Sequence, residues 1–157
     1  GNLFLSRAKI TSLPDDLEVG GSLYLDNASI TALPDNLKVG GMLHLGDTKI
    51  TSLPSGLEVG GNLYLIDTPI ASLPDDLKVG RYLNLSGTVI TSLPDNLTVT
   101  GGLNLTGTPI ASLPSGLEVG GNLDLRNTPL GRRYTKQEIE EMIEDKGGEI
   151  KGGIFVD

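Results

Sequence analysis

The sequence contains no cysteine, no tryptophan and a single histidine, and only six of its 157 residues are aromatic. Without cysteine, the chain has no disulfide bonds and no thiolate metal site. It also shows no secretory leader and no apolar run near the ~18 residues that a transmembrane helix needs. We therefore expect no metal, no cofactor and no membrane partner.

Basic residues are also scarce, because 20 acidic side chains face 12 Lys and Arg, for a net charge of −8. No basic stripe is present to bind nucleic-acid phosphates, so a nucleic-acid partner is not expected. Six acids come within two residues after a proline, as Asp75–Asp76 follow Pro74, which favours solvated turns. A weak calcium site is the alternative, but Ser55–Gly56 and Ser115–Gly116 interrupt the acidic column.

What the sequence does contain is a twenty-residue repeat, for example GNLYLIDTPIASLPDDLKVG over residues 61–80. Related units begin at Gly1, Gly21, Gly41, Arg81 and Gly101, and a partial unit runs from Gly121 to Leu130. A fixed period indicates a repeat protein in which each unit buries its apolar face only against its neighbours. We divide the chain into repeats over residues 1–130 and a C-terminal segment over residues 131–157.

Six apolar positions recur in the units, and in residues 61–80 they are Leu63, Leu65, Ile70, Leu73, Leu77 and Val79. In a strand over residues 62–66, Leu63 and Leu65 point into the core and Tyr64 points out. Strands at this spacing must pair in parallel, since each connection returns to the same end. The return contains Pro74, which predicts an extended or 3₁₀ path rather than a helix.

The pattern LxLxxTxIxxLPxxLxV resembles the short leucine-rich repeats of bacterial and phage-type proteins. The resemblance rests on Leu63, Leu65, Ile70 and Leu73–Pro74 and their equivalents throughout residues 1–130. It implies an α/β solenoid, mostly β, that coils as a right-handed superhelix. In such a fold we expect one parallel sheet, an extended or 3₁₀ return side, and a helix–strand cap at the C-terminus.

One position departs from that family, whose units carry an asparagine that hydrogen-bonds backbone groups between turns. Here threonine takes its place from Thr48 to Thr128, and Ala8 and Ala28 take it in the first two units. A threonine hydroxyl can both donate and accept, so we expect these side chains to point inward and bond the main chain. Alanine has no hydroxyl to form these hydrogen bonds, so the first two turns should be less well held together.

The repeat stops after Leu130, and a helix signal follows. Thr135 and Glu138 form a capping box, and Ile139, Met142 and Ile143 continue at helical spacing. The sequence predicts a short helix over residues 136–146. Residues 150–156 align with residues 119–125, which predicts an eighth strand near residues 154–156 and a cap over the end of the core.

Aromatic side chains gather at the outward positions of the predicted strands. The candidate protein-binding residues are Phe4, Tyr24, Met42, His44, Tyr64, Ile66 and Tyr82. Tyrosine suits such a surface because it supplies contact area at low entropic cost. The alternative is that aromatics favour strands and pair along a ladder without any partner. His44 has no metal-binding neighbour in its own column.

The favoured function is a non-enzymatic leucine-rich-repeat module that binds a macromolecule, in the first place a protein, through its sheet face. One alternative is a structural spacer or stalk within a longer chain. Another is a surface that templates ice or a glycan, prompted by Thr11, Thr31, Thr51 and Thr91, although Ala71 and Ala111 interrupt that column. An enzyme is not expected, because repetition copies one residue set without assembling a catalytic one.

The chain starts at a repeat boundary without an initiator methionine, which suggests a fragment or processed chain with an uncapped N-terminal strand. We expect a monomer, with end-to-end contact at that strand as the route to association. The expected location is the bacterial cytoplasm or a host cell.

Overall fold

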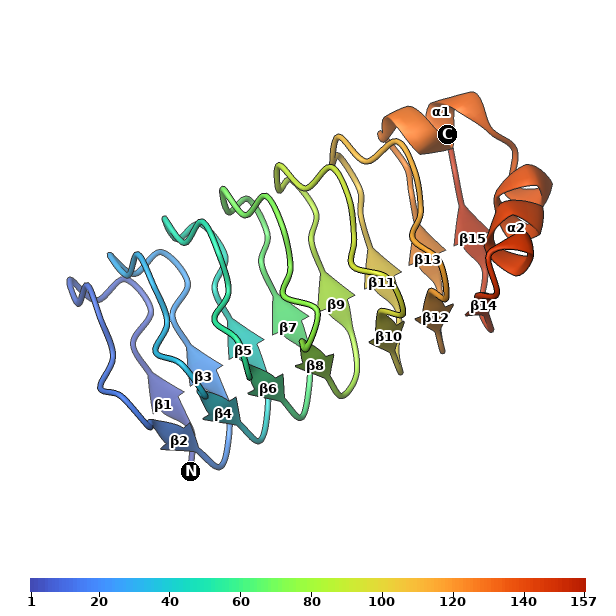
Figure 1. Ribbon diagram of the computed structural model, residues 1–157. Helices are drawn as coiled ribbons and strands as arrows, with labels where there is room; N and C mark the ends of the chain where they lie inside the picture. Colours follow the sequence, from blue (N-terminus) through green and yellow to red (C-terminus); the bar gives the residue numbers. More distant parts are fainter.

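The twenty-residue units stack as successive turns of a coil in the computed structural model, which describes residues 1–157 (Figure 1). Each turn contributes one short strand to each of two parallel sheets. The molecule is therefore a parallel β-solenoid, which confirms the repeat architecture predicted from the period.

The first sheet, here called the front sheet, has eight strands in chain order. They are β1 (Leu3–Phe4), β3 (Leu23–Tyr24), β5 (Leu43–His44), β7 (Leu63–Tyr64), β9 (Leu83–Asn84), β11 (Leu103–Asn104), β13 (Leu123–Asp124) and β15 (Ile154–Phe155). The strands are shorter than the five residues expected, but the register is the predicted one, with Leu63 opposite Leu83. The eighth strand is confirmed, since β15 pairs in parallel with β13.

A second parallel sheet, here called the back sheet, corrects the expectation of a single sheet; of the extended or 3₁₀ return expected, the extended alternative is the one observed. Its seven strands are β2 (Glu18–Val19), β4 (Lys38–Val39), β6 (Glu58–Val59), β8 (Lys78–Val79), β10 (Thr98–Val99), β12 (Glu118–Val119) and β14 (Glu149–Ile150). The end of each return path pairs with the next turn, as when the Gly60 amide donates to the Val39 carbonyl at 2.8 Å. No 3₁₀ helix forms.

The glycines that end most units make this second pairing possible. A Cβ atom on Gly40 or Gly60 would overlap the backbone carbonyl of the glycine twenty residues earlier. Neither glycine has a positive φ, so close approach of successive turns is what excludes a side chain there. The positive φ values instead occur after the front strands, as at Asn27 (58°) and Asp67 (55°), and in the proline turns, as at Asn36 (57°).

The core contains the six predicted apolar columns. Leu63, Leu65 and Ile70 are fully buried, and Leu73, Leu77 and Val79 are at most 8% exposed. Tyr64 is half-buried rather than fully outside. The threonine column is also confirmed, because the buried Thr68 hydroxyl donates to the Leu65 carbonyl at 2.7 Å. This bond lies within one turn, whereas the family's asparagine ties neighbouring turns.

The C-terminal segment closes one end of the core (Figure 1). A short helix that the sequence did not predict, α1 (Pro129–Arg133), precedes the expected α2 (Lys136–Asp145). The capping box of α2 is present, and its Ile139 and Ile143 are buried in the core cluster. At the other end, Leu3 and Leu5 are only partly buried. Neither helix is long and apolar enough to cross a membrane.

Candidate interaction surface

The front face consists of the outward side chains of the front sheet, and all seven predicted residues lie on it. Four of them, Phe4, Tyr24, His44 and Tyr64, form an aromatic ladder with one ring per turn. Successive ring centroids lie 4.8, 4.8 and 4.5 Å apart, with interplanar angles of 8°, 27° and 33°. Parallel strands repeat every ~4.8 Å, so in-register rings fall at stacking distance without further adjustment.

The three other predicted residues lie beside Tyr64, the last rung of the ladder. Tyr82 comes from the neighbouring column and meets Tyr64 at 6.1 Å with a 56° tilt. The Asn62 amide group donates to the Tyr64 hydroxyl at 2.8 Å and contacts the Met42 sulfur at 3.8 Å. Ile66 is half-buried on the same face, in the column on the other side of Tyr64. The structure therefore gathers the hydrophobic part of the candidate site around Tyr64.

The rings of this surface expose their edges more than their faces. Phe4, in the first turn, is 70% exposed, while Tyr24, His44, Tyr64 and Tyr82 are half-buried. The ladder covers most ring faces by mutual stacking. A partner would thus contact ring edges and hydroxyl groups, together with the exposed face of Phe4.

His44 has an acidic neighbour that the sequence analysis missed. Its Nδ1 lies 3.6 Å from a carboxylate oxygen of Asp26, and its Nε2 is buried without a hydrogen-bond partner. Asp26 belongs to the adjacent outward column of the preceding turn, whereas the sequence analysis considered only the column of His44. No group of three potential metal ligands forms anywhere in the structure.

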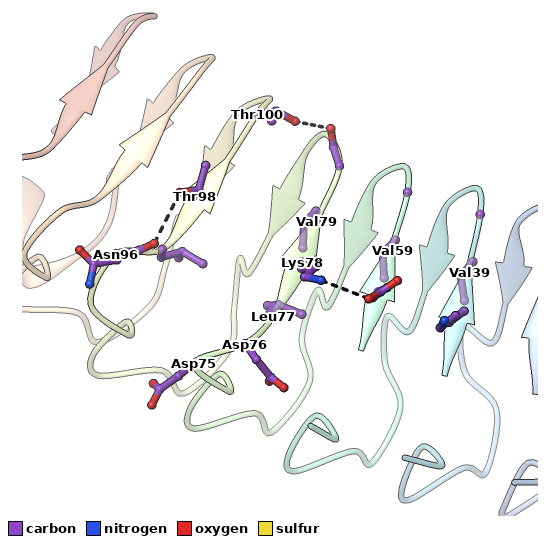
Figure 2. Close-up of a pocket in the computed structure, with 16 residues that line it drawn as sticks. Val39, Val59, Asp75, Asp76, Leu77, Lys78, Val79, Asn96, Thr98 and Thr100 are labelled. Atoms are coloured by element: carbon purple, nitrogen blue, oxygen red, sulfur yellow. Dashed lines mark hydrogen bonds and ion pairs between the residues drawn. The ribbon is translucent and has the colours of Figure 1, made fainter. Parts of the chain in front are cut away.

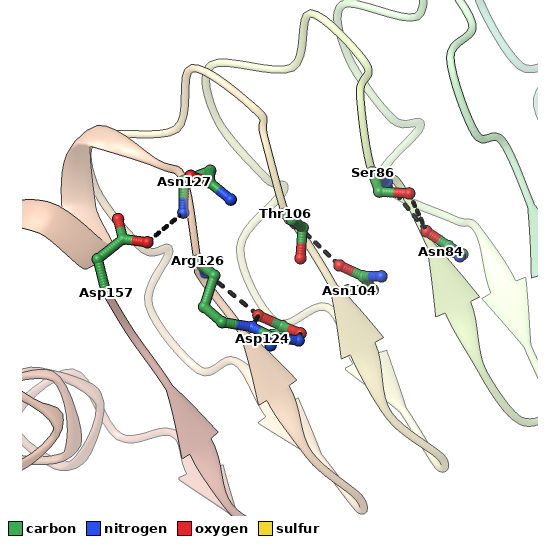
Figure 3. A network of polar contacts seen from close by, with 8 residues as sticks. All are labelled: Asn84, Ser86, Asn104, Thr106, Asp124, Arg126, Asn127 and Asp157. Atoms are coloured by element: carbon green, nitrogen blue, oxygen red, sulfur yellow. Dashed lines mark hydrogen bonds and ion pairs between the residues drawn. The ribbon is translucent and has the colours of Figure 1, made fainter.

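The column of the aromatic ladder continues as polar residues in the later turns (Figure 3). Side-chain oxygens of Asn84, Asn104 and Asp124 accept the backbone N–H two residues further on, at 3.0, 2.9 and 3.2 Å. Such contacts are local turns of the Asx type at the end of each strand. The polar side chains are thus largely engaged within their own turns, and they border the aromatic region.

Two titratable groups in this region are perturbed. The hydrogen bond from Arg126 holds the pKa of Asp124 below its ordinary value, and the Arg126 Nε lies 2.9 Å from the carboxylate. Burial raises the pKa of Tyr82. At neutral pH, Asp124 is therefore ionised and Tyr82 is a neutral hydrogen-bonding group.

A second column of the front face ties the turns together, and the sequence analysis missed this role. Asn2, Ser22 and Asn122 each accept a backbone N–H from the following turn, at 2.8, 3.0 and 2.8 Å. The only signal in the sequence is that short acceptor side chains recur at the second position of the unit. The side-chain oxygens of these residues are already hydrogen-bonded within the sheet, so they are less available to a partner.

The two faces of the solenoid differ sharply in charge. In residues 1–130 the front face consists of three outward columns of seven residues each. Among the Asp, Glu, Lys and Arg residues of the chain, only Asp26, Asp124 and Arg126 lie in these columns. The back sheet presents one outward column, in which charge alternates over the first four strands. The column reads Glu18, Lys38, Glu58, Lys78, Thr98, Glu118 and Glu149. The Lys78 ammonium lies 3.2 Å from the Glu58 carboxylate.

The fold and the repeat define the chain as a two-sheeted parallel β-solenoid of the repeat-protein class. No protein-family model, no curated protein and no solved structure matches the chain. The front face, rather than a relative, is therefore the basis for a functional proposal.

Proposed function

We propose that the chain is a non-enzymatic binding module that recognises another protein through its front face. The observation that carries this proposal is the contrast between the two sheets. The front face is poor in charge and holds five of the six aromatic residues, Phe155 of β15 among them, whereas the outward side chains of the back sheet are mostly charged. The cores of protein interfaces are likewise depleted in charged residues and enriched in Tyr, Phe and Met.

The centre of the proposed interface is Tyr64, with Tyr82 and Met42 beside it. Tyrosine edges combine apolar contact with a hydroxyl that can exchange hydrogen bonds. Asn84 and Asn104 form the polar border, which resembles the polar rim of a typical interface. The stacked turns hold these side chains at fixed spacing, so little side-chain freedom would be lost on binding.

We further propose that the chain is a leucine-rich repeat of the short bacterial or phage type. The periodic Leu63, Leu65, Ile70 and Leu73–Pro74 pattern supports this kinship, and the buried threonine column is its main departure. A bacterial source, and a cytoplasmic or host-targeted location, belong to the same proposal. A catalytic role is not proposed, because the polar residues of the front face hydrogen-bond backbone groups of the turns.

A structural spacer is the second candidate, and the stacking geometry favours it. Each ring between Phe4 and Tyr64 contacts a neighbouring ring, so the ladder stabilises the sheet without any partner. In that case the charge contrast between the sheets would have no binding consequence.

A pair of matched double variants separates these two functions. Tyr64→Ser with Tyr82→Ser alters the front face, and Lys38→Ser with Lys78→Ser alters the back sheet. With each variant used as bait in a native extract, the front variant should lose at least ~30-fold in partner capture, which corresponds to a hot-spot loss of ≥ 2 kcal/mol. The back variant should capture as the parent does. Equal capture by parent and both variants would favour the spacer.

A further inference from the structure

The back sheet is continuous, but it is less completely bonded at one junction, between the fourth unit (residues 61–80) and the fifth (residues 81–100). At each of the remaining junctions of this sheet, two main-chain hydrogen bonds join the turns. Between the third and fourth units, Lys78 N–H donates to the Leu57 carbonyl at 3.3 Å, and Gly80 N–H donates to the Val59 carbonyl at 2.8 Å. The equivalent bonds from Thr98 and Thr100 to the fourth unit are absent. β8 and β10 correspondingly share one residue pair, Val79 with Val99.

The cause lies in the sequence of the fifth unit, which ends in Thr100 where the other complete units end in glycine. At Gly40, Gly60, Gly80 and Gly120, a Cβ atom would overlap the carbonyl of the preceding turn. Thr100 has such a Cβ, and its hydroxyl contacts the Gly80 carbonyl, which places the side chain between the two corners (Figure 2). The side chain therefore acts as a wedge that keeps the fifth turn away from the fourth.

Other features agree with a separation at this junction. An open hollow of about 690 Å³ runs along the back face from the second unit to the fifth and includes this junction, where Leu77, Val79 and Thr98 line it (Figure 2). Leu77 is 8% exposed, whereas its equivalent Leu57 is fully buried. The carboxylate of Asp76 accepts a hydrogen bond from the backbone N–H of Gly56 at 2.8 Å, so the fourth unit is bonded to the third on this side.

The front sheet is continuous across the same junction. Leu63 N–H donates to the Tyr82 carbonyl at 2.8 Å, and Leu65 N–H donates to the Asn84 carbonyl at 2.9 Å. Two blocks of the solenoid are thus joined by a fully bonded front sheet and by fewer main-chain bonds at the back. Relative motion of the blocks would pivot on the front sheet and bend the molecule toward its front face.

We propose that the junction between the fourth and fifth units is a hinge, created by the Thr100 wedge, at which the back sheet opens and closes. The hinge crosses the aromatic surface, because Phe4, Tyr24, His44 and Tyr64 belong to one block and Tyr82 to the other. Opening the back sheet changes the distance between Tyr82 and Tyr64 at the centre of the front face. The proposal concerns motion only and holds whether or not the front face binds a protein.

Backbone amide hydrogen exchange, followed by NMR on the full chain, tests the hinge. In the parent, the Thr98 and Thr100 amides should exchange at least ~100-fold faster than those of Lys78, Gly80, Glu118 and Gly120, because local opening dominates where ladder bonds are missing. In Thr100→Gly, the turn can approach its neighbour, and both amides should slow to within ~10-fold of their equivalents.

A transplanted wedge is the matched control. Gly120→Thr places a Cβ at the next junction, where it would overlap the Thr100 carbonyl, so the Glu118 amide should exchange faster. Spin labels at residues 18 and 118 should also give a broader distance distribution in the parent than in Thr100→Gly. Strong protection of Thr98 and Thr100 in the parent, or no slowing in Thr100→Gly, would overturn the proposal.

Discussion

At the scale of single residues, the inward threonines show how one hydroxyl per turn completes the solenoid. The Leu65 carbonyl accepts from the Thr68 hydroxyl at 2.7 Å and from the Thr68 backbone N–H at 3.2 Å. Thr68→Val keeps the shape and the backbone donor, so we expect a loss of ~1 kcal/mol in the free energy of unfolding. Urea denaturation measures it, and the exposed Thr91→Val is the control. Equal effects of the two changes would show that the buried hydroxyl contributes nothing.

Residue-level prediction succeeded where a side chain follows strand alternation and failed where contacts run between columns. The inward leucines and the outward Tyr64 follow from spacing alone. The contact of His44 with Asp26 is diagonal, and the bond from Ser22 N–H to Asn2 joins a side chain to the next turn. The wedge was missed for a related reason, because the contact of Thr100 is with the Gly80 carbonyl of a neighbouring turn.

At the scale of elements, the N-terminus of α2 depends on an ionised side chain. Hydrogen bonds from the backbone N–H and hydroxyl of Thr135 hold the pKa of Glu138 below its ordinary value. The stabilisation is therefore complete above pH ~4.5 and is lost as the pH falls through the lower pKa of the folded state. Glu138→Gln keeps an acceptor without charge. Between pH 5 and pH 2, the parent should lose more stability than Glu138→Gln, as measured by thermal unfolding of both proteins. Equal losses in the two proteins would contradict the role of the carboxylate.

The back sheet has an in-register column of alternating charge, and its sign pattern can be tested directly. Glu58→Lys would place Lys38, the new lysine and Lys78 on adjacent strands. We expect a loss of ~0.5–1 kcal/mol at low salt, because like charges directly opposite one another repel at an exposed position. Salt screens exposed charges, so the loss should shrink at ~1 M salt. Glu58→Gln is the control with a smaller loss, and a salt-independent loss would point to packing instead.

The back sheet could not be predicted from its own sequence signal. Its strands are two residues long and lie between the proline turn and a glycine corner, as in Lys78–Val79 before Gly80. No alternation can be read in two residues. The front strands are equally short, but Leu63 and Leu65 flank Tyr64 and reveal the pattern. The C-terminal strand was predictable because residues 150–156 repeat the spacing of residues 119–125.

At the scale of the whole molecule, stability spreads along the coil because each turn packs only on its neighbours. The period, the core columns and the C-terminal cap could all be read from the sequence, since they repeat or match a repeat. Leu65→Ala in a fully buried central position should cost ~2–5 kcal/mol. Leu5→Ala, at the partly exposed end, should cost clearly less in the same denaturation experiment. Equal losses would contradict a core that is open at its N-terminal end.

We propose that a protein partner binds the front face and does not bind the back sheet. A photo-cross-linking amino acid placed at Tyr64 tests it most directly, with the same amino acid placed at Glu58 on the back sheet as the matched control. After illumination in a native extract, the account predicts discrete protein adducts from position 64 and none from position 58. Adducts from position 58 alone, or the same adducts from both positions, would contradict it, as would no adduct from position 64.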